Sequence, residues 1–180
     1  MRLAHLLFGA AALLAATPVL AATDGTPGPT STGTVTINAS ITPEVAISDL
    51  DDFTFTATQL QTALNTGAAS AITDDICLWT NNVDDRLFVT ATGDGAGGAF
   101  TLTDGTRTLP YTVRMSTTTG ITRVLATGTK SDSFPITNNG PTCGGATNGG
   151  LSIILLNADI AAMEATTTYT GVLTLLVTPS

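Results

Sequence analysis

The chain has 180 residues, of which 43% are apolar and only 11% are charged, with 14 acidic residues against 6 basic ones. This length supports one domain, or a small pair, with a real core. The formal net charge of -8 comes without a Lys/Arg cluster, which argues against nucleic acid or an anionic membrane surface as a partner. Low charge, 18 glycines and abundant threonine favour pleated strands, so we expect an all-β protein.

Residues 1–21 have the form of a secretory signal peptide. Arg2 supplies the positive start, a short apolar stretch follows, and residues 19–21 give a small-residue cleavage site. The mature chain is then expected to begin at Ala22. The alternative, a retained membrane helix, is disfavoured because the apolar stretch is short and no stop-transfer charges follow it. We therefore expect an exported protein with no membrane insertion of the mature chain.

The next two segments differ sharply in pattern. Residues 22–33 form a linker rich in Pro, Gly and Thr, with nothing to bury. Residues 34–42 alternate polar and apolar without a fault, and Pro43 ends the pattern because proline cannot donate to a strand ladder. Since alternate side chains of a strand lie on opposite faces, this segment has one apolar face, which consists of Val35, Ile37, Ala39 and Ile41.

Residues 43–180 are expected to form one domain of short strands. Clusters of Gly, Asn and Asp separate the strands, and this spacing suggests a β-sandwich or barrel. A helix of one or two turns at 158–165 is the only helix that we predict in the mature chain. The predicted strands are 45–48, 53–57, 76–80, 86–92, 99–103, 108–115, 123–127, 133–136, 151–157 and 169–178.

Two sequence features bear on the cysteines and the glycines. Cys77 and Cys143 both lie in the exported part, and an even count in an oxidising compartment predicts one disulfide rather than a reactive thiol. Residues 93–98 match the dinucleotide-binding pattern G-x-G-x-x-G, but a strand follows them where that motif needs a helix. We therefore predict a glycine hairpin loop there.

The sequence does not favour catalysis or a bound cofactor. His5 is the only histidine and is lost with the signal peptide, which excludes Ser–His–Asp and Cys–His catalysis and His-ligated metals. Acidic doublets at 51–52, 74–75 and 84–85 lack the spacing of a calcium loop, and Asp is common in turns. A glycosidase would use paired carboxylates, usually with aromatic platforms, whereas Trp79 is the single tryptophan and is expected to pack on the disulfide. We expect no enzyme, no cofactor and no metal site.

The last predicted strand, 169–178, is strongly apolar. Val172 and Leu176 lie on one face, and the opposite face includes Tyr169, Leu173, Leu175 and Val177. A strand that is apolar on both faces is typically covered by something. As a chain-terminal strand it needs partners on both edges, because an uncovered apolar edge invites aggregation.

These features together resemble a chaperone–usher pilin. Residues 33–43 resemble the donor segment of the alpha-class, colonisation-factor type major pilins, and residues 169–175 resemble their final strand. The middle of the chain looks more like the archaic pilins and spore-coat-protein-U-like domains, in segments 77–79, 98–102, 109–113 and 143–145.

The resemblance implies an immunoglobulin-like β-sandwich that lacks its last strand. A neighbouring subunit would supply that strand from its N-terminal extension, here 34–42, beside groove-lining candidates Tyr169, Leu173, Leu175 and Val177. It also implies identical or related pilin subunits, a periplasmic chaperone and an outer-membrane usher as partners, and a role in adhesion or biofilm formation. The alternative is that residues 34–42 pair within their own chain. The protein would then be a self-contained exported β-domain, coat-like or binding glycan or calcium, that does not polymerise.

Overall fold

The computed structural model describes residues 22–180, so the predicted signal peptide at 1–21 lies outside the described residues. The chain divides after Ile41 into two units. In the first unit, Thr23 and Thr34 form an antiparallel bridge with backbone N–H···O distances of 3.0 and 2.9 Å. Residues 35–41 belong to no helix or strand, and the side chains of Val35, Ile37 and Ile41 are 74%, 88% and 81% exposed.

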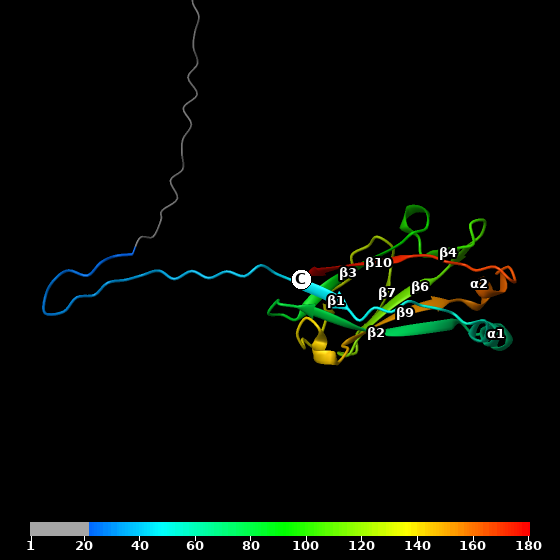
Figure 1. Cartoon of the computed structure of the whole chain (residues 1–180), viewed down its shortest axis with the longest axis horizontal. Coiled ribbons are helices and arrows are strands. Elements are labelled where there is room, and N and C mark those ends of the chain that lie inside the picture. The colour runs from blue at the N-terminus through cyan, green and yellow to red at the C-terminus, as the bar shows by residue number, and fades with distance from the viewer. Residues whose placement is uncertain (1–21) are drawn as a thin grey trace, which may run out of the picture. The chain divides into compact units, whose positions relative to one another are not determined.

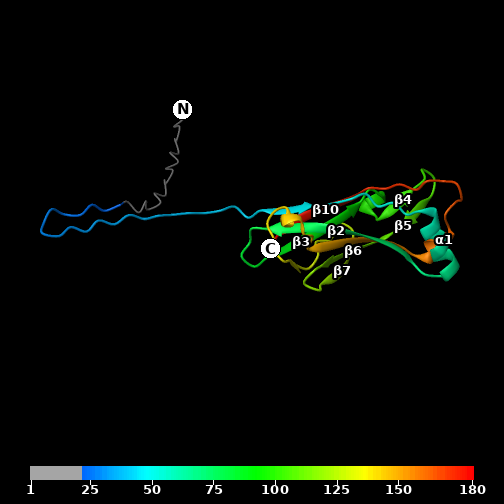
Figure 2. The same cartoon turned by 60° about the horizontal axis from the view of Figure 1, so that its bottom comes forward.

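The second unit, Thr42–Ser180, is built from antiparallel sheets around one core (Figures 1 and 2). The larger sheet has the order β1–β2–β9–β6–β7, with strands Val45–Ser48, Ser70–Thr80, Gly149–Leu155, Thr112–Thr117 and Thr122–Leu125. The smaller sheet has the order β10–β3–β8, with strands Leu173–Pro179, Arg86–Gly93 and Phe134–Pro135. A separate pair joins β4, Thr101–Thr103, to β5, Thr108–Pro110. The all-β prediction is confirmed.

Two α-helices lie at one end of this unit (Figure 1). Helix α1, Ala57–Thr66, begins with a capping box: the Thr56 N–H donates to Gln59 Oε1 at 2.8 Å and the Gln59 N–H donates to Thr56 Oγ1 at 3.3 Å. It ends at Gly67, whose φ of 71° suits a glycine. The predicted strand at 53–57 is therefore wrong. Helix α2, Asn157–Ala161, confirms the short helix predicted at 158–165, and the presence of α1 shows that it is not the only helix.

The structure also corrects two of the predicted strands and the predicted hairpin loop. The strand predicted at 108–115 is divided at Tyr111 between β5 and β6, because Pro110 has no N–H to donate and the Tyr111 N–H donates to Phe100 O at 2.9 Å instead. The last strand begins at Leu173 rather than Tyr169. The glycine segment 93–98 is not a hairpin, since β3 pairs with β10 and β8 whereas β4 pairs with β5; a short 3₁₀ turn, Ala96–Gly98, links them.

The core spans both sheets and is tied by the predicted disulfide. Cys77 of β2 is bonded to Cys143 of a second 3₁₀ turn, Cys143–Gly145, with a Cα–Cα distance of 5.8 Å. Trp79 lies two residues further along β2, on the same face of the strand as Cys77, and is half-buried. None of the helices in the described part of the chain has the length and apolar character needed to cross a membrane.

Candidate functional site

The C-terminal strand β10 has a partner on one edge only. It pairs with β3 along all seven of its residues, from Leu173 opposite Gly93 to Pro179 opposite Leu87. Among residues 22–180, no strand pairs with its other edge. Strand β1 likewise pairs with β2 alone, and it lies next to β10 without pairing to it. Since alternate N–H and C=O groups of an edge strand point away from its neighbour, β10 presents a row of groups able to accept another strand.

Side-chain burial is uneven across this edge. Val177 lies directly opposite Val89 in the β10–β3 ladder, and Leu175 lies opposite Ala91. Cross-strand partners share a face of the sheet, so all four side chains point to the same core. Val89 and Ala91 are 0% exposed, whereas Val177 and Leu175 are only partly buried. The core is therefore fully covered at β3 and incompletely covered one strand further out.

The same incomplete cover continues on the side of β1. Val45 and Ile47 of β1 pack against the core and remain partly exposed, as do Phe53 and Phe55 in the segment before α1. None of these four residues was predicted from the sequence to belong to the site. The alternation of Phe and Thr at 53–56 was visible in the sequence, but the position of β1 next to β10 depends on long-range pairing.

The structure brings the predicted groove-lining residues together along one edge. Leu173, Leu175 and Val177 lie on one face of β10. Tyr169 precedes the strand, packs against the same core and accepts a hydrogen bond at its hydroxyl from the Glu164 N–H at 3.1 Å. The residues predicted to be donated belong instead to the first unit, and they are exposed: Val35, Ile37, Ala39 and Ile41.

The backbone entering β1 is held by the Asn81 side chain. Its Nδ2 donates to Thr42 O at 2.9 Å, and its Oδ1 accepts from the Glu44 N–H at 2.7 Å. The Asn81 N–H in turn donates to Glu44 O at 3.1 Å. These bonds flank Pro43, whose φ is fixed by its ring. No local sequence pattern indicated this clamp by Asn81. It sets the direction of the backbone where the chain enters β1.

Charged groups gather at the turn between β4 and β5. The backbone N–H groups of Arg107 and Thr106 donate to Asp104 and hold the pKa of its carboxyl below the usual range. Glu164 forms an ion pair with Arg107 and raises the pKa of that guanidinium. These groups lie at or near the surface, and their hydrogen bonds and ion pair order the turn locally.

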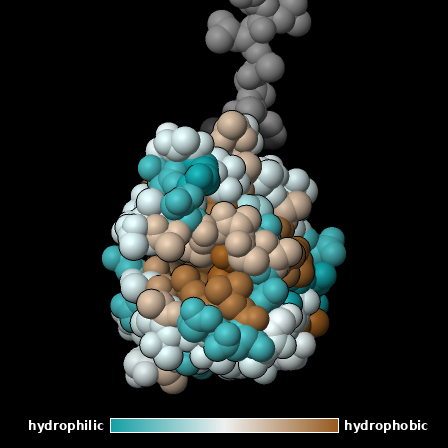
Figure 3. All heavy atoms as spheres, turned by 90° about the vertical axis from the view of Figure 1, so that its right-hand side faces the viewer, coloured by the Kyte–Doolittle hydropathy of each residue, from teal (hydrophilic) through white to brown (hydrophobic). Residues whose placement is uncertain are grey.

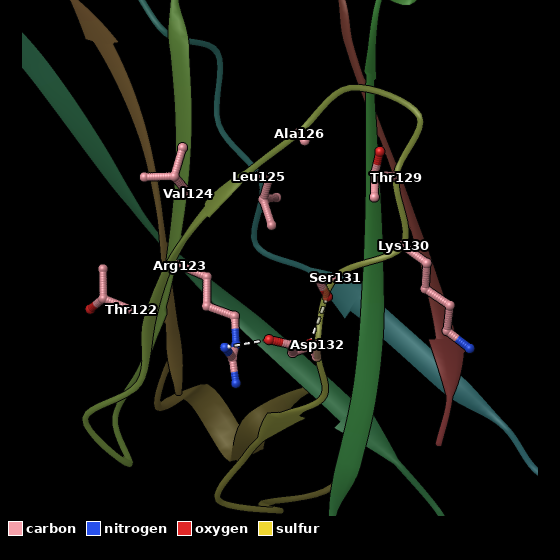
Figure 4. A pocket seen from close by; sticks show the side chains of 9 residues that line it. All are labelled: Thr122, Arg123, Val124, Leu125, Ala126, Thr129, Lys130, Ser131 and Asp132. Carbon is pink, nitrogen blue, oxygen red and sulfur yellow. Dashed lines mark hydrogen bonds and ion pairs between the residues drawn. The ribbon is translucent and has the colours of Figure 1, made fainter.

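A shallow hollow of about 460 Å³ lies between β7 and the segment that precedes β8 (Figure 4). Arg123 of β7 reaches Asp132 across it, with Nη1 and Oδ2 3.0 Å apart. Lys130 points away from this pair, toward Phe88, with Nζ 3.6 Å from the ring centroid. The charged side chains that line this hollow therefore already have partners within the chain. No group of three or more His, Cys, Asp or Glu side chains that could hold a metal ion occurs among residues 22–180.

Comparison with known proteins gives a structural likeness only. No protein-family model matches the chain, and no curated protein matches it in sequence. A chain in the solved structure of a chaperone–tip adhesin complex, described as vital for synergistic activation of CFA/I fimbriae biogenesis, is similar with a TM-score of 0.51 and 17% identity. The match covers 77% of this chain and 41% of that one. The predicted immunoglobulin-like β-sandwich is thereby confirmed, and the fold is shared with part of a chain in that chaperone–tip adhesin complex.

Proposed function

We propose that this protein is a structural subunit of a bacterial surface fimbria that polymerises by donor-strand complementation. Residues 34–42 of one copy add as a strand beside β10 of the next copy. A periplasmic chaperone occupies the same edge before assembly, and an outer-membrane usher exports the subunits to the cell surface. The polymer serves adhesion or biofilm formation.

The observation that carries the proposal is the half-buried face of β10 beside the fully buried face of β3. A strand added at the free edge of β10 would complete the cover over Leu175 and Val177. In strand addition the main chain supplies affinity and alternate side chains enter the core. Burying the apolar side chains of residues 34–42 contributes roughly 5–9 kcal/mol as an upper estimate, before backbone hydrogen bonds are counted.

The donor segment is long enough to span the acceptor strand, and its pattern suits an inner face. Strand β10 has seven residues and the donor segment has nine, which correspond to about 23 and 30 Å at about 3.3 Å per residue. The donor places an apolar side chain at every second position, as an inner face requires. A contact in which each copy donates at one site and accepts at another does not close on itself and generates a filament.

Two observations support export of this protein and its place in a fimbria. The Cys77–Cys143 disulfide is of the kind that forms in oxidising compartments such as the periplasm. The likeness to a chain of a chaperone–tip adhesin complex supports chaperone and pilin partners for this chain.

Deleting residues 22–42 tests the proposal. The truncated chain is expected to remain a folded monomer and to form no polymer, whereas the chain beginning at Ala22 forms polymers visible by electron microscopy. A synthetic peptide of residues 34–42 should bind the truncated chain and raise its Tm. A peptide carrying Ile37→Asp serves as the matched control and should bind far more weakly.

Two outcomes would contradict the proposal. Unchanged polymerisation after the deletion would show that residues 34–42 are not the donor. A full-length chain that stays monomeric at every concentration, even after its chaperone is removed, would favour a self-contained exported β-domain.

A further inference from the structure

Resting on the donor-strand assembly proposed above, we propose that the turn between β2 and β3 of one copy, with Val83 at its tip, packs on the α1–α2 end of the next copy. Val83 follows β2 and precedes β3, next to the point where the chain enters β1. The interaction is therefore a second contact between copies, additional to the inserted strand, and it is made by the folded domains themselves.

The connection between the donor segment and its own domain forces such a contact. Only Pro43 and Glu44 separate Thr42, the last donor residue, from Val45 at the start of β1. Three residue steps span at most about 11 Å. The Asn81 side chain forms hydrogen bonds with Thr42 and Glu44, on both sides of Pro43. These bonds fix the direction in which this connection leaves the domain. The end of the donating domain must then lie against the acceptor, at the place where Thr42 emerges.

Strand direction decides which end of the acceptor is involved. Every paired strand in the named sheets of residues 42–180 is antiparallel to its partner. A donor added antiparallel to β10 runs from Pro179 towards Leu173, so Thr42 emerges at the Leu173 end. Figure 1 shows α1 and α2 at this end, opposite the C-terminus. The end of the donating copy that carries the β2–β3 turn therefore meets the α1–α2 end of the accepting copy.

The α1–α2 end presents an apolar surface to receive a partner. Figure 3 views this end and shows a strongly apolar patch at its centre, with weakly apolar residues above it and hydrophilic residues below it. Large apolar side chains that these helices and their flanks leave exposed include Leu64, 38% exposed, and Leu156, 52% exposed. Leu60 of α1 and Met163 after α2 are partly buried against the core. A gathered apolar surface with a polar rim is typical of a protein interface.

The opposite end presents an exposed apolar side chain, Val83, on the ordered turn between β2 and β3. Val83 is fully exposed, and its neighbours are held in place. Asn82 Nδ2 donates to Ser180 O at 3.1 Å, and Asp85 Oδ1 accepts from Asn138 Nδ2 at 2.8 Å. An apolar residue on one end that meets a complementary surface on the other end gives a contact that repeats along a filament.

Cross-linking of paired cysteines tests this contact. Both native cysteines are joined in the disulfide, so introduced thiols react alone. The double variant Val83→Cys/Leu156→Cys places thiols at opposite ends of β2, whose eleven residues span about 35 Å. A short bis-maleimide therefore cannot join them within one copy. The expected result is a ladder of covalent oligomers on a denaturing gel after treatment of the polymer.

The matched control is Val124→Cys/Leu156→Cys, because Val124 is an exposed valine of β7 away from the turn. Polymer that cross-links no better through Val83 than through Val124 would overturn the inference, as would cross-linking of the single Val83→Cys variant to itself. Since all substituted side chains are exposed, the variants should fold, and Val83→Cys/Leu64→Cys repeats the test at a second position. Absence of polymer from the unsubstituted chain would instead refute the proposed function.

Discussion

The side-chain amide of Asn148 pairs with both backbone groups of Leu78 in the core of the sandwich. The Leu78 N–H donates to Asn148 Oδ1 at 2.8 Å, and Asn148 Nδ2 donates to Leu78 O at 2.7 Å. The same Nδ2 also donates to Thr137 O at 2.7 Å. The backbone ladder between β2 and β9 ends at Ile76 and Gly149, so the Asn148 amide continues it where the main chain cannot.

Replacing this amide should destabilise the domain strongly. Asn148 is 1% exposed, and Asn148→Ala leaves the N–H and C=O of Leu78 and the C=O of Thr137 without their partner. We expect the free energy of unfolding to fall by about 2–4 kcal/mol. Chemical denaturation measures this loss, and Asn139→Ala, at an exposed site, is the control that should change little. Equal effects of the two substitutions would contradict the role of Asn148.

Breaking the disulfide should lower stability by a comparable amount. Cys77 and Cys143 are 66 residues apart in the sequence, and closing a loop of that size restricts the unfolded chain by about 4 kcal/mol on the chain-entropy account. The double variant Cys77→Ser/Cys143→Ser should therefore unfold at a lower denaturant concentration than the oxidised protein. The reduced native protein is the matched comparison, and an unfolding midpoint unaffected by reductant would be inconsistent with this account.

Stability should decline at high pH through Tyr111. Burial, with a smaller contribution from the negative charge of Asp94, raises the pKa of its phenol to about 12 from the ordinary 10.0. Because the folded-state pKa is the higher one, the stabilisation is complete below pH 10 and is lost as the pH rises towards 12. Phenolate absorbance of the folded protein should show a tyrosine that ionises near pH 12. The Tyr111→Phe variant should lose less stability over this pH interval than the native chain.

Only one face of the donor segment should matter for assembly. Ile37→Asp puts a charge on the apolar face, where insertion would bury it unpaired, and should abolish polymers. Asn38→Asp puts the same charge on the opposite face, which would remain in solvent, and should leave assembly nearly intact. Electron microscopy and sedimentation of both variants provide the comparison. Equal loss of polymer would argue against insertion of residues 34–42 as a strand.

Local pattern predicted much of the fold, and its failures have physical causes. The strand at 45–48 was predicted with the bounds that the structure shows, and 86–92 was short of β3 by one residue. The helix α1 was missed because Phe and Thr alternate at 53–56, although the Thr56–Gln59 capping box was a readable signal. The break at Tyr111 follows from Pro110, which ends one ladder and lets the chain pass to the other sheet.

The candidate site could be predicted only in part. The apolar face of residues 34–42 and the apolar strand at the C-terminus are local patterns, so both were visible in the sequence. The pairing of β10 with β3, the position of β1 beside β10 and the clamp by Asn81 depend on residues far apart in the chain. Periodicity carries no information about such contacts, because it reports which side chains share a face and not which strands become neighbours.

The position of the disulfide has a mechanical consequence for a filament built as proposed. Tension would enter each subunit at Val45 and leave through β10, so it would act along the chain between these two strands. The 66-residue separation bridged by Cys77 and Cys143 lies within that stretch. The pulling force would be transmitted through the S–S bond and would not reach the chain from β3 to β8. The residues of these strands could therefore not be extended. Each subunit would yield a limited length under force and keep a closed loop from which to refold.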